Sequence, residues 1–149
     1  MLIMMTFDVA VMCLALNVYY EGATIEEPME GLFAVAQVTY RRANGEWQNL
    51  CRVVSARKQF SWTINAVANT DGRGVMTLKS SWTPNYNSKA WRTSVGIARA
   101  VALKIVPVDY SRGATHYHHV DVFPTWSACG VKPVVSWGGH KFFDKVCRA

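Results

Sequence analysis

The chain has 149 residues, of which half are apolar and only 17% are charged, and it holds six each of Trp, Tyr and Phe. This composition excludes a disordered chain and predicts one packed domain over residues 1–149. The net charge of +6 favours a polyanionic partner such as nucleic acid, anionic lipid or an anionic cell-wall polymer, or else reflects only a soluble surface with a basic bias. The basic residues are too scattered for the dense tract typical of nucleic-acid binding.

The first predicted element is a buried helix that ends at Glu21. At a 4, 3, 4, 3 spacing, one stripe of this helix carries Phe7, Val11, Leu14, Val18 and Glu21. The apolar start has no basic region and includes Asp8, so we interpret it as a core helix and not as a signal peptide. No segment reaches the roughly 18 apolar residues of a membrane span, so we expect no stable membrane insertion.

Three further helical segments follow, separated by turn signals. Gly22 is a natural end for the first helix, the second helix begins near Pro28 and stops by Asn44-Gly45, and a third piece covers residues 47–57. Residues 60–87 lose the periodic pattern and are predicted to form a long functional or mobile loop. The pattern resumes over 87–107, with an apolar stripe of Trp91, Val95, Ala98, Ala102 and Ile105.

The last part of the chain changes to β-type sequence. Residues 110–126 are extended and aromatic, and Gly138-Gly139 separates two β-prone runs, which indicates a hairpin. We therefore predict an α+β fold that is mainly α, with a small antiparallel β-hairpin region near the C-terminus.

The cysteines and histidines raise the question of a metal. Cys13, Cys51, Cys129 and Cys147 form no CxxC pair, so we expect free buried thiols and no zinc ribbon. His116 and His118 would share one face of a strand, near His119 and His140. Because no acidic ligand lies at a recognisable spacing, we expect packed or substrate-contacting histidines, no metal and no cofactor.

Glu21 stands out among the carboxylates. A carboxylate at a helix C-terminus meets the negative end of the helix dipole, and apolar surroundings disfavour its charged form further. Such a group suits a general acid, although Glu21 could also be merely the first polar residue after a core helix. Glu26, Glu27 and Glu30 flank Pro28 at a helix start, where negative charge is favourable for reasons unrelated to catalysis.

Aromatic residues outside the helices suggest a sugar-binding groove. Pyranose rings stack on aromatic faces while their hydroxyls need donors and acceptors. The candidates, each of which could instead be a core residue, are Phe60, Trp62, Trp82, Tyr86, Tyr117, Trp126 and Trp137.

Several motifs together resemble the SleB-type cell wall hydrolases, a group of spore-cortex lytic enzymes and phage endolysins. They are "ALNVYYEG", "EEPMEGLFAVAQVTYRR", "KQFSWT", "GATHYHH" followed by "PTW", and "GGHKFF". The resemblance covers about residues 13–143 in the family's order. It implies a lysozyme-like, mainly helical fold that cleaves the bond between N-acetylmuramic acid and N-acetylglucosamine.

The resemblance also points to Glu21. In the family pattern, similar to Asn-x-x-x-Glu-Ala-Arg-Gly-Glu-Pro, the first glutamate is catalytic, and Asn17 with Glu21 matches it. Here two residues are inserted, the arginine is missing, and Glu27 aligns with the Glu-Pro step. The loop beside the site is therefore expected to differ in shape.

One convincing acid fits a lytic transglycosylase, which forms a 1,6-anhydro product, whereas a hydrolytic muramidase needs a second carboxylate. Asp71, Asp109 or Asp121 could supply that carboxylate. The predicted substrate-binding residues are Gln59, Phe60, Ser61, Trp62, Thr115, Tyr117, His118 and Trp126.

Two alternatives from other classes stay open. A non-enzymatic basic module would bind nucleic acid or wall polymer in a salt-sensitive way that does not depend on Glu21. A zinc peptidase or amidase that uses the histidines would lose activity with a chelator. The leading interpretation is a monomeric endolysin, made in the host cytoplasm, that acts on peptidoglycan glycan strands and not on nucleic acid once another factor has opened the membrane.

Overall fold

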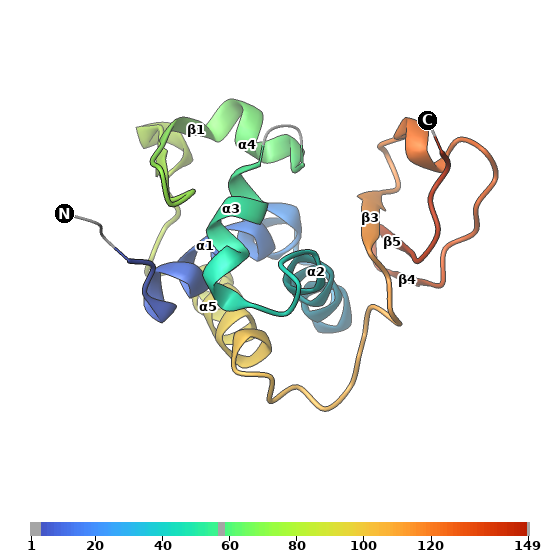
Figure 1. The fold of residues 1–149 in the computed structure, drawn as a ribbon, viewed down its shortest axis with the longest axis horizontal. Coiled ribbons are helices and arrows are strands. Elements are labelled where there is room, and N and C mark those ends of the chain that lie inside the picture. Colours follow the sequence, from blue (N-terminus) through green and yellow to red (C-terminus); the bar gives the residue numbers. More distant parts are fainter. Residues whose placement is uncertain (1–3, 57–58, 149) are drawn as a thin grey trace.

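Helix α1 (Phe7–Glu21) is the centre of the fold. The computed structural model describes residues 4–56 and 59–148. Within it, the predicted stripe residues Val11, Leu14 and Val18 are fully buried. Helices α2 (Met29–Arg42), α3 (Leu50–Ser55) and α5 (Lys89–Ala102) pack around α1 (Figure 1). No helix in the described ranges is both long and apolar enough to cross a membrane.

Capping side chains mark the starts of two long helices. The side chain of Thr6 caps α1 by accepting from the Val9 N–H, and that of Ser88 caps α5 by accepting from the Trp91 N–H. The short 3-10 helices η1 (Ala23–Ile25) and η2 (Trp47–Asn49) precede α2 and α3.

The predicted helix over 87–107 is too long. Helix α5 ends at Ala102, and Lys104 then takes a positive φ of 59°. Ile105, which was placed on the apolar stripe, lies beyond the helix and is 66% exposed. Pro107 therefore follows a chain that has already left the helix.

The segment 60–87, predicted as a loop, has regular structure. It contains α4 (Ser61–Ala66), an antiparallel hairpin of β1 (Val67–Thr70) and β2 (Met76–Leu78), and η3 (Ser80–Trp82). A helix of six residues and strands of three or four are too short to give a periodic signal.

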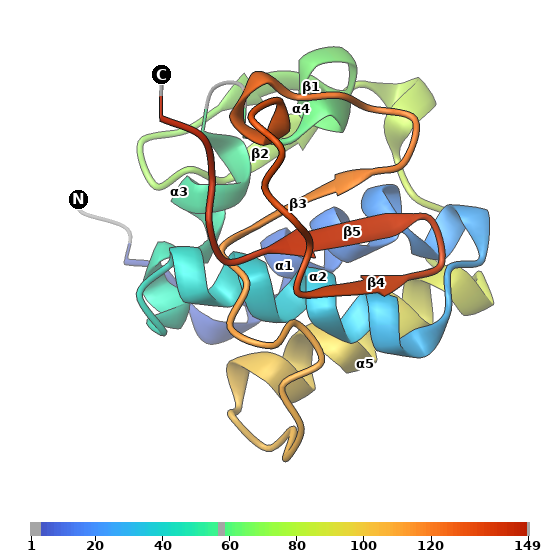
Figure 2. The ribbon, with the colours of Figure 1, turned by 90° about the vertical axis from the view of Figure 1, so that its right-hand side faces the viewer.

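The predicted C-terminal hairpin is confirmed as part of a three-stranded antiparallel sheet. Its strands are β3 (His116–His119), β4 (Val135–Trp137) and β5 (His140–Phe143), in the order β3-β5-β4, and η4 (Thr125–Ser127) lies between β3 and β4. The register places both His119 and Trp137 opposite His140. The sheet covers α2, which lies between it and α1 (Figures 1 and 2).

The prediction of free thiols is wrong. Cys13 on α1 is bonded to Cys51 on α3, and Cys129 is bonded to Cys147 in the C-terminal region. The Cα atoms of the two pairs lie 5.1 and 5.8 Å apart, within the usual range for a disulfide. Cysteine spacing alone could not reveal these pairs, because each joins segments that only folding brings together.

Removal of either disulfide should destabilise the fold, and the larger loop should matter more. The Cys13–Cys51 bond joins residues 38 apart and the Cys129–Cys147 bond residues 18 apart. Chain entropy predicts losses of about 4 kcal/mol for the Cys13→Ala/Cys51→Ala variant and about 3 kcal/mol for Cys129→Ala/Cys147→Ala. Urea unfolding without reductant measures both, and wild-type stability in both variants would contradict the cross-links.

Candidate active site

A cleft of about 270 Å³ opens between the helices and the C-terminal sheet. Its lining contains seven of the nine predicted site residues: Glu21, Gln59, Phe60, Ser61, Tyr117, His118 and Trp126. His119, one of the histidines expected to be packed or substrate-contacting, also lines the cleft. The sequence analysis missed the other lining residues, which are Arg42, Ile64, Val122 and Pro124. The cleft therefore collects side chains from the ends of α1 and α2, from α4, and from β3 and the segment after it.

Glu21 is the last residue of α1, and its side chain is only 14% exposed. Gly22 caps the helix as predicted, but its φ of −151° is not left-handed. A Cβ at this position would lie 2.6 Å from Cδ2 of Leu32 on α2. Gly22 therefore lets the chain turn closely against α2 directly after the carboxylate, where a larger residue would have to displace the end of the Leu32 side chain.

His140 lies between Glu21 and Glu27. Its Nδ1 is 3.2 Å from Oε1 of Glu27, and its Nε2 is 3.7 Å from Oε2 of Glu21. The ring is buried, and Nε2 is the one buried side-chain N or O atom in the described residues that has no hydrogen-bond partner. A buried polar atom without a partner is costly, and this one faces the Glu21 carboxylate.

Glu27 has a different role from the one predicted. Its side chain is only 8% exposed, and both carboxylate oxygens accept from the Gly139 N–H, at 3.0 and 2.9 Å. A Cβ on Gly139 would lie 2.7 Å from Oε1 of Glu27, and Gly138 has a φ of 55°. The glycine pair thus makes the β4–β5 turn and also admits the Glu27 carboxylate. Glu27 is a buried anchor for His140 and not simply a helix-terminus charge.

Asn17, one helical turn before Glu21, connects four elements around the cleft. Its Nδ2 donates to Thr39 Oγ1 on α2 and to the Tyr117 hydroxyl on β3, both at 3.1 Å. Its Oδ1 accepts from Trp62 Nε1 on α4 at 2.9 Å. Every polar atom of this fully buried amide therefore has a partner.

Aromatic rings form the cleft walls. The Phe60 and Tyr117 rings stack 6.2 Å apart, and Trp126 packs against His116 and His118 at 5.0 and 5.5 Å. Burial and the nearby Glu21 charge raise the pKa of Tyr117 well above its usual value, so its hydroxyl stays protonated. Burial and the Arg42 charge lower the pKa of His116, which favours the neutral ring.

Two predicted binding residues lie outside the cleft lining. Trp62 is buried beneath it, where its ring stacks on Tyr20 and its N–H is bonded to Asn17. Thr115 precedes β3, and its hydroxyl is 2.9 Å from His116 Nδ1. Their partners Asn17 and His116 in turn contact the lining residues Tyr117 and Trp126, and the motif alone could not separate such residues from the lining itself.

The histidines do not form a metal centre in the described part of the chain. No group of three or more His, Cys, Asp or Glu side chains there is placed to hold an ion. His118 Nδ1 instead lies 2.8 Å from the carbonyl of His119, and His140 lies between the two glutamates.

Loss of the Asn17 amide should be strongly destabilising. Asn17→Leu keeps a similar volume but leaves the Trp62 N–H and the Tyr117 and Thr39 hydroxyls without this partner. We expect the free energy of unfolding to fall by about 3 kcal/mol, measured in urea. Thr39→Val, which removes one of these bonds, should cost about 1 kcal/mol. Equal stability of Asn17→Leu and the wild type would contradict the assigned network.

Comparison with known proteins identifies the family. A family model described as Cell Wall Hydrolase matches residues 26–143, which include Glu27, His140 and all of the cleft lining except Glu21. Comparisons with curated proteins and with solved structures find no match. Because the matched segment covers most of the sequence, the chain belongs to the cell wall hydrolase family.

Proposed function

We propose that the protein cleaves peptidoglycan glycan strands between N-acetylmuramic acid and N-acetylglucosamine, as a lytic transglycosylase in which Glu21 is the general acid and base. Family membership indicates peptidoglycan as the substrate. The observation that carries the finer proposal is that Glu21 is the one carboxylate among the described residues that line the cleft. A transglycosylase needs one such group, whereas most glycosidases use two.

The other carboxylates considered are engaged or lie elsewhere. Asp71 forms an ion pair with Arg73 within the β1–β2 hairpin, and Asp109 forms one with Arg41. Asp121 is 86% exposed and is not part of the cleft lining. Asp121 does lie 3.4 Å from Nδ1 of the lining residue His119, so it is the carboxylate that a hydrolytic outcome would implicate. Glu27 is held against the Gly139 N–H and does not line the cleft.

The proposed reaction consumes no water. Protonated Glu21 gives its proton to the glycosidic oxygen as the bond from that oxygen to C1 of the muramic residue breaks. The C6 hydroxyl of the same muramic residue attacks C1 and forms the 1,6-anhydro ring. The proton of that hydroxyl passes to the Glu21 carboxylate, which restores the acid for the next cycle.

His140 and Glu27 are suited to position Glu21. With the Nδ1 proton directed to Glu27, the lone pair of Nε2 faces the Glu21 carboxyl group. This tautomer follows from the carboxylate beside Nδ1. In this orientation His140 can contact the Glu21 carboxyl group from behind the cleft and fix its direction.

The walls of the cleft provide the contacts that a sugar strand needs. Tyr117 and Trp126 are partly exposed rings of the lining, and Phe60, only 3% exposed, packs against Tyr117. The Gln59 amide and Ser61 hydroxyl offer donors and acceptors. We propose that these five residues, with His118, bind the glycan on either side of the cleaved bond.

We further propose that the protein acts as a monomeric endolysin, made in the cytoplasm and active at the wall after the membrane has been opened. The two disulfides support action outside the cytoplasm, because such bonds persist in oxidising compartments.

The function is tested by digesting purified peptidoglycan with wild type and with Glu21→Gln. Mass spectrometry should find wild-type products one water lighter than hydrolysis products, and the variant should lose at least 100-fold in rate. Reducing-end muramic products would indicate a muramidase instead. Equal digestion by the variant would exclude Glu21 as the acid, and loss of wild-type activity in chelator would favour a metal-dependent amidase.

The positioning role predicts a separation of kinetic effects. His140→Gln and Glu27→Gln should each lower kcat about 10- to 100-fold with KM nearly unchanged, since neither residue lines the cleft. The double variant should be no worse than the more impaired single variant, because the two residues act as one unit. A rise in KM at constant kcat would contradict this role, and thermal unfolding of each variant controls for simple destabilisation.

A further inference from the structure

Arg41 and Arg42 are adjacent in the sequence but have opposite environments. Arg41 donates to the Ser111 hydroxyl at 3.0 Å and to the Ala114 carbonyl, and it forms an ion pair with Asp109 at 3.0 Å. Within the described ranges, Arg42 forms no ion pair with a carboxylate, and its side chain makes no hydrogen bond. Arg41 is thus held by partners within the protein, whereas the N–H donors of Arg42 have no partner among the described residues.

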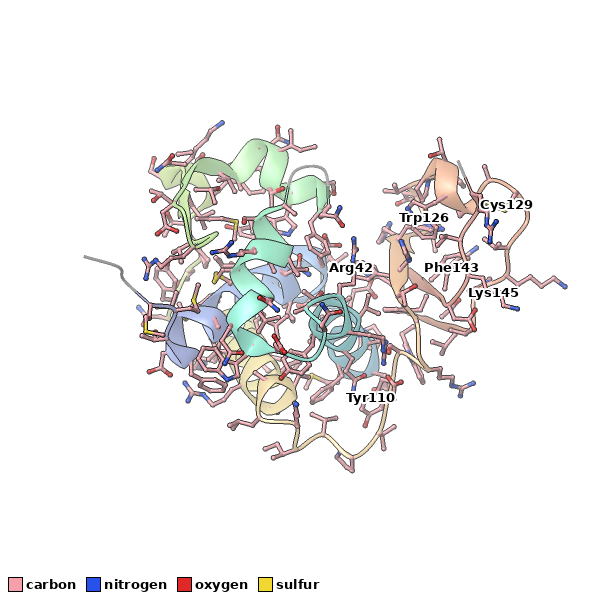
Figure 3. The ribbon with its side chains drawn as sticks, in the orientation of Figure 1. Arg42, Tyr110, Trp126, Cys129, Phe143 and Lys145 are labelled. Carbon is pink, nitrogen blue, oxygen red and sulfur yellow. A yellow bond between two sulfur atoms is a disulfide. The ribbon has the colours of Figure 1, made fainter. Side chains whose placement is uncertain are left out.

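Arg42 is directed into the cleft that contains Glu21. It belongs to the cleft lining, and its guanidinium carbon lies 5.7 Å from the centre of the Phe60 ring. Figure 3 shows Arg42 on the side of α2 toward the C-terminal sheet, with Trp126 across from it. The ring contact orients a planar cation and leaves its edge free for a ligand.

The position is costly for a cation that pairs with no carboxylate in residues 4–56 and 59–148. Arg42 is partly buried, and this burial lowers the pKa of its guanidinium, although the nearby Tyr117 phenol opposes the shift. The guanidinium nevertheless stays charged at neutral pH. A partly desolvated guanidinium that finds no hydrogen-bond partner among the described residues is matched best by a carboxylate, which it can bind through two parallel hydrogen bonds.

We propose that Arg42 is a binding site for a carboxylate group carried by the glycan strand next to the cleaved bond. This inference rests on the proposed function and adds the recognition of an anionic substituent. In peptidoglycan, the lactyl group of the muramic residue is amide-linked to a stem peptide, whose free carboxylates are the anions near the sugar chain. The cleft would then distinguish a strand with charged stems from a neutral β-1,4 glycan.

Binding measurements test the site independently of cleavage. The protein carries Glu21→Gln, and the ligands are soluble glycan strands with native stems, the same strands after carbodiimide conversion of carboxylates to amides, and strands stripped of stems by an amidase. We expect Arg42→Gln to weaken binding of native strands on the order of 10- to 100-fold. Amidation of the strands should weaken their binding to the Glu21→Gln protein by the same factor. It should not change their binding to the variant that also carries Arg42→Gln.

A matched control separates this site from general basicity. Arg92 on α5 is exposed and lies outside the cleft lining, so Arg92→Gln removes the same charge at a distance. It should reduce binding less than about 3-fold. Arg42→Lys keeps the charge but loses the paired donors, so it should restore only part of the affinity.

A failure of this inference can be told apart from a failure of the proposed function. The inference is overturned if amidated and native strands bind equally, or if Arg92→Gln weakens binding as much as Arg42→Gln does. Tight binding of stripped strands that depends on Arg42 would mean that the carboxylate bound is the lactyl group freed by the amidase. If wild type cleaves no strand while Arg42-dependent binding is present, the transglycosylase proposal fails and the carboxylate site stands.

Discussion

The buried amide of Asn17 is the interaction on which the arrangement of the cleft depends. It has one acceptor and two donor hydrogens, and these connect α1 to α2, α4 and β3. An amide without partners would cost more than an apolar side chain at the same place, so the four elements are held in the one arrangement that satisfies it. Since Glu21 follows one turn later, this arrangement also fixes where the carboxylate lies relative to the aromatic walls.

A second constraint acts from the sheet side. Strand alternation directs His140 and Phe142 inward together, which places an imidazole in a mainly apolar interior. Glu27 makes this possible, because its carboxylate reaches Nδ1 through the space left by two glycines. The result is a buried unit of Glu27 and His140 with its one unsatisfied nitrogen facing Glu21. Two carboxylates thus approach the same ring, and only one of them is part of the cleft lining.

The features that the sequence could predict are those encoded locally. The long helices, the turn at Gly138-Gly139 and the position of Glu21 at a helix end follow from periodicity and turn chemistry. The disulfides, the anchoring role of Glu27 and the contribution of Arg42 do not, because each depends on segments that are distant in the sequence. Trp62 and Thr115 were assigned to the groove because a motif gives only proximity along the chain. In the structure Trp62 is bonded to Asn17 and Thr115 lies against His116, and neither lines the cleft.

The pair Arg41 and Arg42 explains why a net charge of +6 says little about mechanism. Successive helical residues point about 100° apart, so two identical side chains at the end of α2 face different surroundings. One is directed to the loop after α5 and is neutralised by Asp109. The other is directed into a cleft whose single described carboxylate, Glu21, is only 14% exposed. A positive charge at that point attracts an anionic strand, and it also disfavours protonation of the nearby His116. The positive charge of the cleft therefore depends on the direction of Arg42 on its helix and not on the overall composition.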